Sequence, residues 1–350
     1  MPVRAPRLSP LAACIAVLLG AALCAQAQRR PPAAIPANYL GPTTPNTYQP
    51  LAPASQPAPD PIRVIPIPDS LRRSLRLNPF YTKTLTIRGI PIVASPKTSD
   101  YALLECAYTL DHMLQDSPAS VLHALTAARV HVGIISVVEY TMDIPENQNR
   151  RNLDPTEAAF QDRRSRGLGG LPLATCAEEN LLNLRSDPYA AENITIHEFS
   201  HTVASAIRFA TPAWYQKLRD TYAQAMKEGL FAHSYSATNE QEYWAEGAQA
   251  WFDCAAQRKD PSVHSGIWNR DQLKAYDPRL AALLAEVYGD GAWRYVKSTN
   301  LPLRVANQTF TRPPADLLHL AGLNRDHFPT FSFENSPRIR AAATLPATSP

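Results

Sequence analysis

Five consecutive residues, His197-Glu198-Phe199-Ser200-His201, place two imidazoles four positions apart with a carboxylate beside the first. If this segment is helical, both histidines lie on one face, because residues four apart stand about one turn apart. Two imidazoles at that spacing can bind one Zn²⁺, and the neighbouring glutamate can hold a water molecule on the metal. These residues therefore indicate zinc-assisted hydrolysis. The alternative is an ordinary amphipathic helix with two surface histidines.

A catalytic zinc site needs a third protein ligand and leaves the fourth position for water. A second segment offers candidates, because Glu242 and Glu246 share one face of a helix that Thr238 or Asn239 can cap. Two carboxylates on a buried face are unfavourable unless a cation or hydrogen bonds satisfy them. Zinc bound with the two histidines would do so. The alternative is a solvated acidic helix start, stabilised by the helix dipole.

Together, segments 197–201 and 235–247 resemble the catalytic domain of anthrax lethal factor and related gluzincin zinc metallopeptidases. They are also similar to a wider set of secreted, mostly uncharacterised metallopeptidases that share a Tyr-Trp-Ala-Glu-Gly helix, here Tyr243 to Gly247. Looser similarity to this wider set runs from about residue 85 to residue 295. Nothing in the chain matches the substrate-recognition domains of lethal factor, so no substrate follows from the resemblance.

The resemblance implies that one Zn²⁺ per chain is bound by His197, His201 and Glu242. It further implies that Glu198 is the general base, that Tyr235 assists the transition state, and that Glu246 contacts a ligand histidine from outside the ligand set. Zinc would lower the pKa of a water molecule toward about 7, and Glu198 would accept its proton. Hydroxide would then attack a peptide carbonyl, with Tyr235 helping to hold the developing oxyanion. The remaining histidines, including His264, have no ligand spacing.

The composition of the 350-residue chain, with 45% hydrophobic and 19% charged residues, is that of a protein with a sizeable core. Its formal net charge of +3, from 34 basic and 31 acidic residues, is too balanced to indicate a nucleic-acid partner. We therefore expect a peptide or protein substrate. No later stretch reaches the roughly 18 apolar residues of a spanning helix, so we expect no integral membrane segment. The sequence does not specify the oligomeric state.

The N-terminal residues 1–27 have the form of a signal peptide. Arg4 and Arg7 precede an apolar stretch over 11–23, and Ala25-Gln26-Ala27 resembles a cleavage site. We therefore expect an exported protein, either secreted or held in the periplasm or cell envelope.

Proline-rich composition marks the next segment. Twelve of the 33 prolines fall between Pro31 and Pro68, which predicts a disordered tether over 28–75. Residues 333–350 have a similar composition and predict a flexible tail. The zincin-like catalytic domain is then expected over 76–332.

Three cysteines, Cys106, Cys176 and Cys254, remain after the expected cleavage. In an oxidising compartment they predict one disulfide and one buried free thiol. We favour Cys176–Cys254, because both lie near the segments that carry the chemistry.

Strand signals precede helix signals, which predicts an α+β fold of the zincin type. Strands are expected over 83–88 and 130–138, and a helix with an apolar face from Leu103 to Leu114 lies between them. Residues 141–170 are expected to form a long loop. The C-terminal half is expected to be helical, over 188–209, 213–228, 239–257 and 278–288.

In this fold a small sheet packs on the helix that carries the two histidines. Asp187-Pro188 is the expected start of that helix, because aspartate is a favoured cap and proline a favoured first residue. An exposed sheet edge near Gly169 to Thr175 could align an extended peptide by strand addition.

Two other functions compete with a secreted peptidase. One is a catalytically silent zincin-like envelope or binding protein, although a purely structural metal site would not need Glu198. The other is a zinc amidase that acts on cell-wall peptides. No sequence feature separates the amidase from the peptidase.

Overall fold

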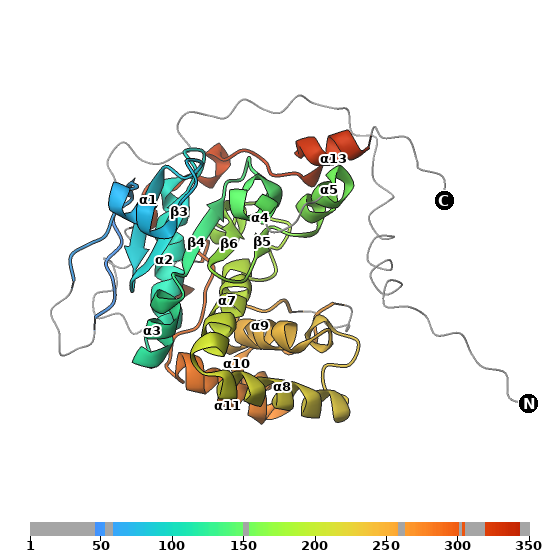
Figure 1. Ribbon diagram of the computed structural model, residues 1–350. Helices are drawn as coiled ribbons and strands as arrows, with labels where there is room; N and C mark the ends of the chain where they lie inside the picture. Colours follow the sequence, from blue (N-terminus) through green and yellow to red (C-terminus); the bar gives the residue numbers. More distant parts are fainter. Residues whose placement is uncertain are drawn as a thin grey trace, which may run out of the picture. The chain divides into compact units, whose positions relative to one another are not determined.

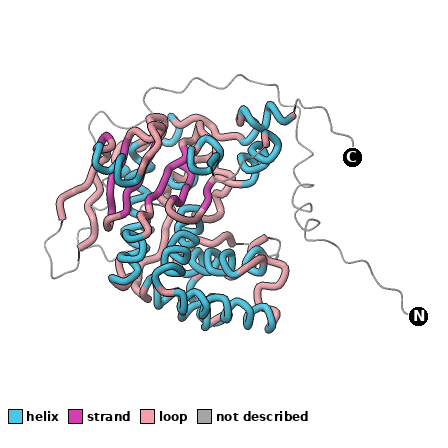
Figure 2. Tube along the Cα trace, in the orientation of Figure 1, coloured by secondary structure: helices cyan, strands magenta, loops and turns pink. Residues whose placement is uncertain are grey.

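A sheet from the first half of the chain and a group of helices from the second half make up the fold (Figures 1 and 2). The computed structural model describes residues 46–52, 59–149, 154–257, 263–300, 303–304 and 319–343. The order of the elements confirms the predicted α+β class. The predicted signal peptide over 1–27 lies outside the described residues.

Six strands of the described chain form one sheet in the order β1-β2-β3-β4-β6-β5. Their bounds are Ile65–Pro66 (β1), Lys83–Ile87 (β2), Ile90–Ala94 (β3), His131–Ile135 (β4), Gly167–Leu168 (β5) and Leu173–Ala177 (β6). The central strands β3, β4 and β6 run parallel and are buried throughout, because helices and loops cover both of their faces. Strand β5 pairs antiparallel with β6 and forms one edge.

Helices and 3-10 turns surround this sheet and build the second half of the molecule. The helices are α1 (Asp69–Leu75), α2 (Asp100–Leu114), α3 (Ala119–Ala127), α4 (Pro145–Asn149), α5 (Pro155–Arg164), α6 (Glu178–Leu181), α7 (Ile194–Ala210), α8 (Pro212–Lys227), α9 (Glu240–Trp251), α10 (Arg270–Tyr276), α11 (Pro278–Tyr288) and α13 (Pro337–Ala342). The 3-10 turns are η1 (Thr141–Asp143), η2 (Tyr235–Ala237), η4 (Arg325–His327) and η5 (Phe333–Asn335). Helix α7 contacts β5 and β6 as well as α8 and α9, so it joins the sheet to the helical half (Figure 1).

The predicted apolar face of α7 is buried. Ile196, Phe199, Val203 and Ile207 are no more than 6% exposed. Trp244 of α9 packs in the same core, and its indole N–H donates to the Ser200 carbonyl at 2.9 Å. Burial of a large apolar side chain stabilises the fold by about 1.5–3 kcal/mol. This face therefore fixes how α7 and α9 lie against each other.

A buried ion cluster joins distant parts of the chain. Glu105 of α2 pairs with Arg304 at 2.6 Å and with His319 at 2.8 Å, and all three side chains are at most 1% exposed. The Tyr108 ring lies over the Arg304 guanidinium at 4.4 Å. Charges this deeply buried need such partners.

The predicted tether over 28–75 is wrong for its second part. Residues 59–75 contain β1 and α1, and Tyr48 forms a bridge with Ile62 and is 1% exposed. The prolines concealed this order, because Pro66 occupies an edge strand and Pro68 precedes a helix, and both positions tolerate proline. Residues 28–45 and 53–58 of the predicted tether lie outside the described part.

The predicted flexible tail is also wrong where the structure describes it. Helix α13 packs on α5, and Ile339 is 3% exposed. Arg338 pairs with Asp143 at 2.6 Å and with Asp162 at 2.7 Å. These partners are far away in the sequence, so local composition could not reveal them. Residues 344–350 lie outside the described part.

Two further expectations need correction. The predicted loop over 141–170 contains α5, a polar helix that Asp154 caps and Pro155 begins. The predicted Cys176–Cys254 disulfide is absent, since all three described cysteines are free and buried.

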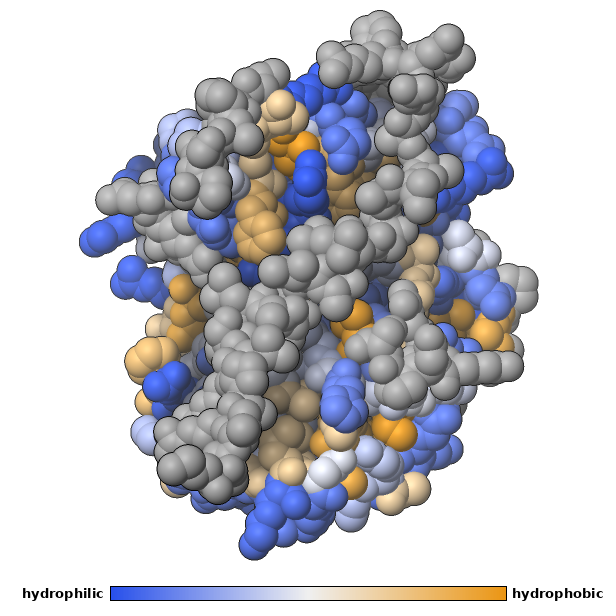
Figure 3. Space-filling model, turned by 90° about the vertical axis from the view of Figure 1, so that its right-hand side faces the viewer, coloured by the Kyte–Doolittle hydropathy of each residue, from blue (hydrophilic) through white to orange (hydrophobic). Residues whose placement is uncertain are grey.

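On the surface, hydrophilic and hydrophobic residues are interspersed over the visible face in Figure 3. The large apolar side chains that are exposed come from separate elements: Ile65, Phe160, Phe209, Tyr276 and Leu303. Within the described ranges, no helix combines the length and apolar character that a membrane span requires.

Candidate metal centre

Helix α7, which carries both histidines, begins at Ile194 and not at the predicted Pro188. Asn193 caps it, because its side-chain oxygen accepts a 2.9 Å hydrogen bond from a backbone N–H of the first turn. The predicted cap, Asp187, instead accepts a hydrogen bond from the Asn180 side chain at 2.9 Å. Asp187 also accepts from the Tyr189 N–H at 2.9 Å, so it stabilises a turn that precedes α7.

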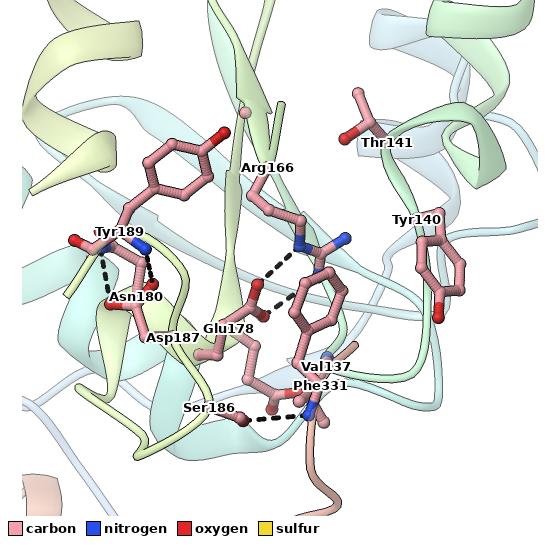
Figure 4. Close-up of polar contacts among 12 residues, drawn as sticks. Val137, Tyr140, Thr141, Arg166, Glu178, Asn180, Ser186, Asp187, Tyr189 and Phe331 are labelled. Atoms are coloured by element: carbon pink, nitrogen blue, oxygen red, sulfur yellow. Dashed lines mark hydrogen bonds and ion pairs between the residues drawn. The ribbon is translucent and has the colours of Figure 1, made fainter. Parts of the chain in front are cut away.

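Asn180 of α6 holds the segment before α7 in place (Figure 4). Its amide nitrogen donates to Asp187, to the Tyr189 carbonyl at 3.2 Å and to the Glu192 carbonyl at 3.0 Å. Its amide oxygen accepts from the Ile194 N–H at 2.8 Å. One buried side chain thus fixes where α7 starts, and with it the position of the histidines relative to the sheet.

A buried arginine fixes the edge strand in a similar way (Figure 4). Arg166, the residue before β5, donates to both carboxylate oxygens of Glu179 at 2.6 and 3.0 Å. It also donates to the carbonyls of Glu139 and Ser136, and the Phe331 ring lies 4.2 Å from the guanidinium carbon. Bidentate charged bonds of this kind are strong and directional. They set the position of β5 beside α7.

Three side chains from α7 and α9 converge on one point. His197 Nε2 lies 3.1 Å from His201 Nε2 and 3.2 Å from Glu242 Oε2, and the last two atoms are 3.3 Å apart. The side chains are 8%, 11% and 16% exposed in that order. Ligand atoms around tetrahedral zinc, with bonds of about 2.0–2.1 Å, stand about 3.3–3.4 Å apart. These three atoms therefore have the spacing of ligands that share one ion, and the residues could hold a metal.

The start of α9 places Glu242. Asn239, one of the two predicted caps, accepts hydrogen bonds from the Gln241 and Glu242 N–H groups, both at 2.9 Å. Glu242 then lies in the first turn of α9. On the same helix, Trp244 donates to the Ser200 carbonyl of α7, which joins the two helices.

Electrostatics couple the three groups. Burial opposes a charge on His197, but the contact with Glu242 and the charges of Glu198 and Glu246 outweigh it and raise the pKa of His197 to about 10. Burial also opposes the charge on Glu242, yet its contacts with His197 and His201 hold the pKa of this carboxyl well below its usual range. The acids thus favour positive charge at these atoms, which a divalent cation would supply.

The other ring nitrogen of His197 also has partners. Its Nδ1–H donates to Gln249 Oε1 at 3.1 Å, and Glu246 Oε1 lies 3.6 Å away. The expected contact between Glu246 and a histidine is thus present, but it is longer than the contact of the same nitrogen with Gln249. The sequence reasoning missed Gln249, although it follows Glu242 and Glu246 on the same helical face at positions i, i+4 and i+7. Such contacts fix the tautomer that leaves Nε2 for a metal.

Glu198 and Tyr235 both lie near this cluster. Glu198 is partly exposed, and its charge raises the pKa of both His197 and Tyr235. The Tyr235 ring stacks against the His197 ring, with centroids 6.4 Å apart, and its N–H donates to the Val263 carbonyl at 2.6 Å. Burial first, and then the Glu242 charge, raise the pKa of the Tyr235 phenol. The hydroxyl therefore stays protonated and can donate a hydrogen bond.

The end of the edge strand packs directly on helix α7. A Cβ atom added to Gly169 would lie 2.5 Å from the Glu198 carbonyl oxygen and 2.5 Å from His201 Cβ. Only glycine allows this approach. The expected edge near Gly169 to Thr175 is therefore wrong in position. Leu173 to Thr175 belong to the interior strand β6, and the edge is β5, which ends just before Gly169.

The structure also assembles a group that the sequence did not reveal. Glu192, Glu246 and His264 place one potential ligand atom each within 4.8 Å of one another. His264 and Glu192 belong to segments without secondary structure, so no periodic spacing signals their approach.

Comparison with known proteins finds no matching family and no matching curated protein. Among solved structures, the chain is similar to the Pro-Pro endopeptidase (PPEP-2) from Paenibacillus alvei, with 15% sequence identity. The match covers 56% of this chain and 96% of that one, with a TM-score of 0.35. A TM-score this low does not show that the two folds are the same. The proposals below therefore rest on the geometry of this chain.

Proposed function

We propose that the protein is a zinc metallopeptidase of the gluzincin type, with His197, His201 and Glu242 as metal ligands. The observation that carries this proposal is the mutual approach of three ligand atoms, from two helices, to 3.1–3.3 Å. Glu198, next to the first histidine, supports hydrolysis over a purely structural metal site, because a structural site needs no base.

When bound, zinc lowers the pKa of a water molecule and polarises a carbonyl group. Glu198 would accept a proton from the attacking water and return it to the leaving amine. The protonated Tyr235 hydroxyl donates to the carbonyl oxygen as its negative charge grows. Gln249 and Glu246 keep the proton of His197 on Nδ1.

Strand β5 supports a peptide as the substrate. Among the described strands it pairs only with β6, and so its outer edge can accept another strand. An extended peptide added there would run alongside α7, because Gly169 brings the end of this strand against Glu198 and His201. Export of the protein, which rests on residues 1–27, stays part of this proposal.

The experiment compares the zinc-loaded full chain with Glu198→Gln, which should retain one zinc at the proposed ligands and lose at least about 10²-fold in turnover. The substrates are casein and purified cell wall. Glu286→Gln, at a 44% exposed side chain on α11, is the matched control and should keep full activity. Full activity in Glu198→Gln would exclude Glu198 as the general base. Release of wall peptides without casein cleavage would favour the amidase, and a zinc-loaded chain that cleaves neither would contradict hydrolysis.

A further inference from the structure

Glu192, Glu246 and His264 form a second group of potential metal ligands beside the proposed peptidase centre. We propose that these three side chains bind a second divalent cation. The proposal goes beyond the peptidase function, because none of the three residues belongs to the ligand set His197, His201 and Glu242.

The distances within this group support an ion between the side chains. His264 Nδ1 lies 3.5 Å from Glu246 Oε2, and its Nε2 lies 3.8 Å from Glu192 Oε1. A charge-assisted N–H···O bond measures about 2.7–2.9 Å. Both contacts are longer than that, although the first is still a hydrogen bond. A single ion can bind only one of the two ring nitrogens, and one ligand atom from each of the three residues lies within 4.8 Å of the other two.

Contacts outside the group hold each side chain in place. Glu192 accepts from the Gln249 side chain at 3.0 Å through Oε2, which leaves Oε1 directed at His264. Glu246 directs Oε1 at His197 and Oε2 at His264. The neighbour of His264, Val263, accepts the Tyr235 N–H. The three ligand atoms are therefore positioned before any ion binds, which favours binding.

Charge and burial give the second argument. The Glu192, Glu246 and His264 side chains are only 10%, 7% and 12% exposed. Burial raises the pKa of Glu192, because its charged form loses water. The group contains two carboxylates and one imidazole, so two negative charges meet a single possible cationic partner. A divalent cation would compensate both.

The ligand chemistry points to a metal that accepts both nitrogen and oxygen. Two carboxylates and one imidazole suit Zn²⁺, with water at the remaining position. The second ion would lie on the Nδ1 side of His197, whereas the first lies on the Nε2 side. Glu246 would then be shared, with one oxygen toward His197 and the other toward the second ion.

The test loads the full chain with Zn²⁺, dialyses it against metal-free buffer, and measures zinc per chain. We expect two equivalents in the wild type and in the Glu286→Gln control. Glu192→Gln should fall to one equivalent by losing the second site, and His201→Ala should fall to one by losing the first. If Glu192→Gln does not fold, His264→Gln replaces it. An anomalous difference map at the zinc edge, from crystals of the wild type, locates each ion without any variant.

Each outcome decides the proposal. One zinc in the wild type, located between His197, His201 and Glu242, would overturn the second site and leave the peptidase proposal intact. One zinc located between Glu192, Glu246 and His264 would do the reverse. Two zinc ions that both persist in Glu192→Gln would place the second ion elsewhere and overturn the assignment. No zinc in the wild type would overturn both proposals.

Discussion

At the residue scale, the two acids on α9 face different sides of His197. Glu242 lies 3.2 Å from Nε2, whereas Glu246 lies 3.6 Å from Nδ1. Glu242→Ala should therefore weaken zinc binding at the peptidase centre by more than Glu246→Ala, because loss of an outer partner typically costs only about 10–100-fold in metal affinity. Competition with a chromogenic chelator measures the dissociation constant of this site. The opposite order would exchange the roles of the two acids.

Tyr235 offers a second test at this scale. Its hydroxyl is protonated and lies near Glu242 but is not in the ligand set. Tyr235→Phe should keep its zinc and lower kcat by about 10²–10³-fold, with a smaller effect on KM, because the hydroxyl acts on the charge of the transition state. Tyr276→Phe, which removes a hydroxyl that accepts from the Phe231 N–H, is the control. Unchanged turnover in Tyr235→Phe would make it a packing residue.

The sequence predicted part of this site for clear reasons. The helical spacing of the two histidines and of the two acids could be read directly, and the resemblance selected Glu242 over Glu246 as the ligand. His264 could not be found in this way, because it approaches Glu246 through a segment without secondary structure. Glu192 was missed for the same reason.

At the element scale, the packing of the edge strand on α7 depends on one glycine. In Gly169→Ala the added Cβ would collide with the Glu198 carbonyl at 2.5 Å, so the backbone must shift. We expect a loss of stability of about 1–3 kcal/mol together with lower turnover. Gly229→Ala is the control for general glycine effects, since its Cβ would meet nothing within 4 Å although its φ of +75° carries its own cost. Equal effects of the two substitutions on turnover would contradict a close contact at Gly169.

His112 on helix α2 should make the stability of the protein depend on pH. Burial, only partly offset by the hydrogen bond to the Tyr108 carbonyl, lowers the pKa of His112 to about 3. The unfolded chain binds this proton near pH 6.5, so this residue's contribution to stability is lost as pH falls from about 6.5 toward 3, by up to about 1.4 kcal/mol per pH unit. His112→Phe removes the effect, and its unfolding free energy should vary less with pH over this range. Denaturant titrations from pH 4 to pH 7 compare the two slopes, and identical slopes would contradict a neutral buried His112.

The elements were predictable where local signals decide them. The face of α7 followed from the spacing of Ile196, Phe199 and Val203. Its start did not, because the choice between Asp187 and Asn193 as cap depends on Asn180, which belongs to another helix. Helix α13 was missed because its partners on α5 and η1 lie far away in the sequence.

At the scale of the whole molecule, the C-terminal segment stabilises the body. Deletion of residues 333–350 would remove Ser336 and Arg338, which both contact the fully buried carboxylate of Asp162. An unpaired buried charge of this kind costs about 3–5 kcal/mol. Calorimetry should therefore show a lower Tm for this deletion. A shorter deletion, of 344–350, keeps these contacts and should leave Tm unchanged, and equal Tm values for both deletions would exclude this role.

The ion cluster around Glu105 has a consequence for the synthesis of the protein. Its partners Arg304 and His319 follow 199 and 214 positions later in the chain. While the ribosome is still making the last segment, Glu105 has neither partner. Burial of α2 at that stage would leave the Glu105 carboxylate unpaired in the protein interior, which is unfavourable. The body should therefore mature only after translation is nearly complete, as is typical of topologies rich in distant contacts. For the hydrolase proposed above, such a delay would keep the nascent chain inactive.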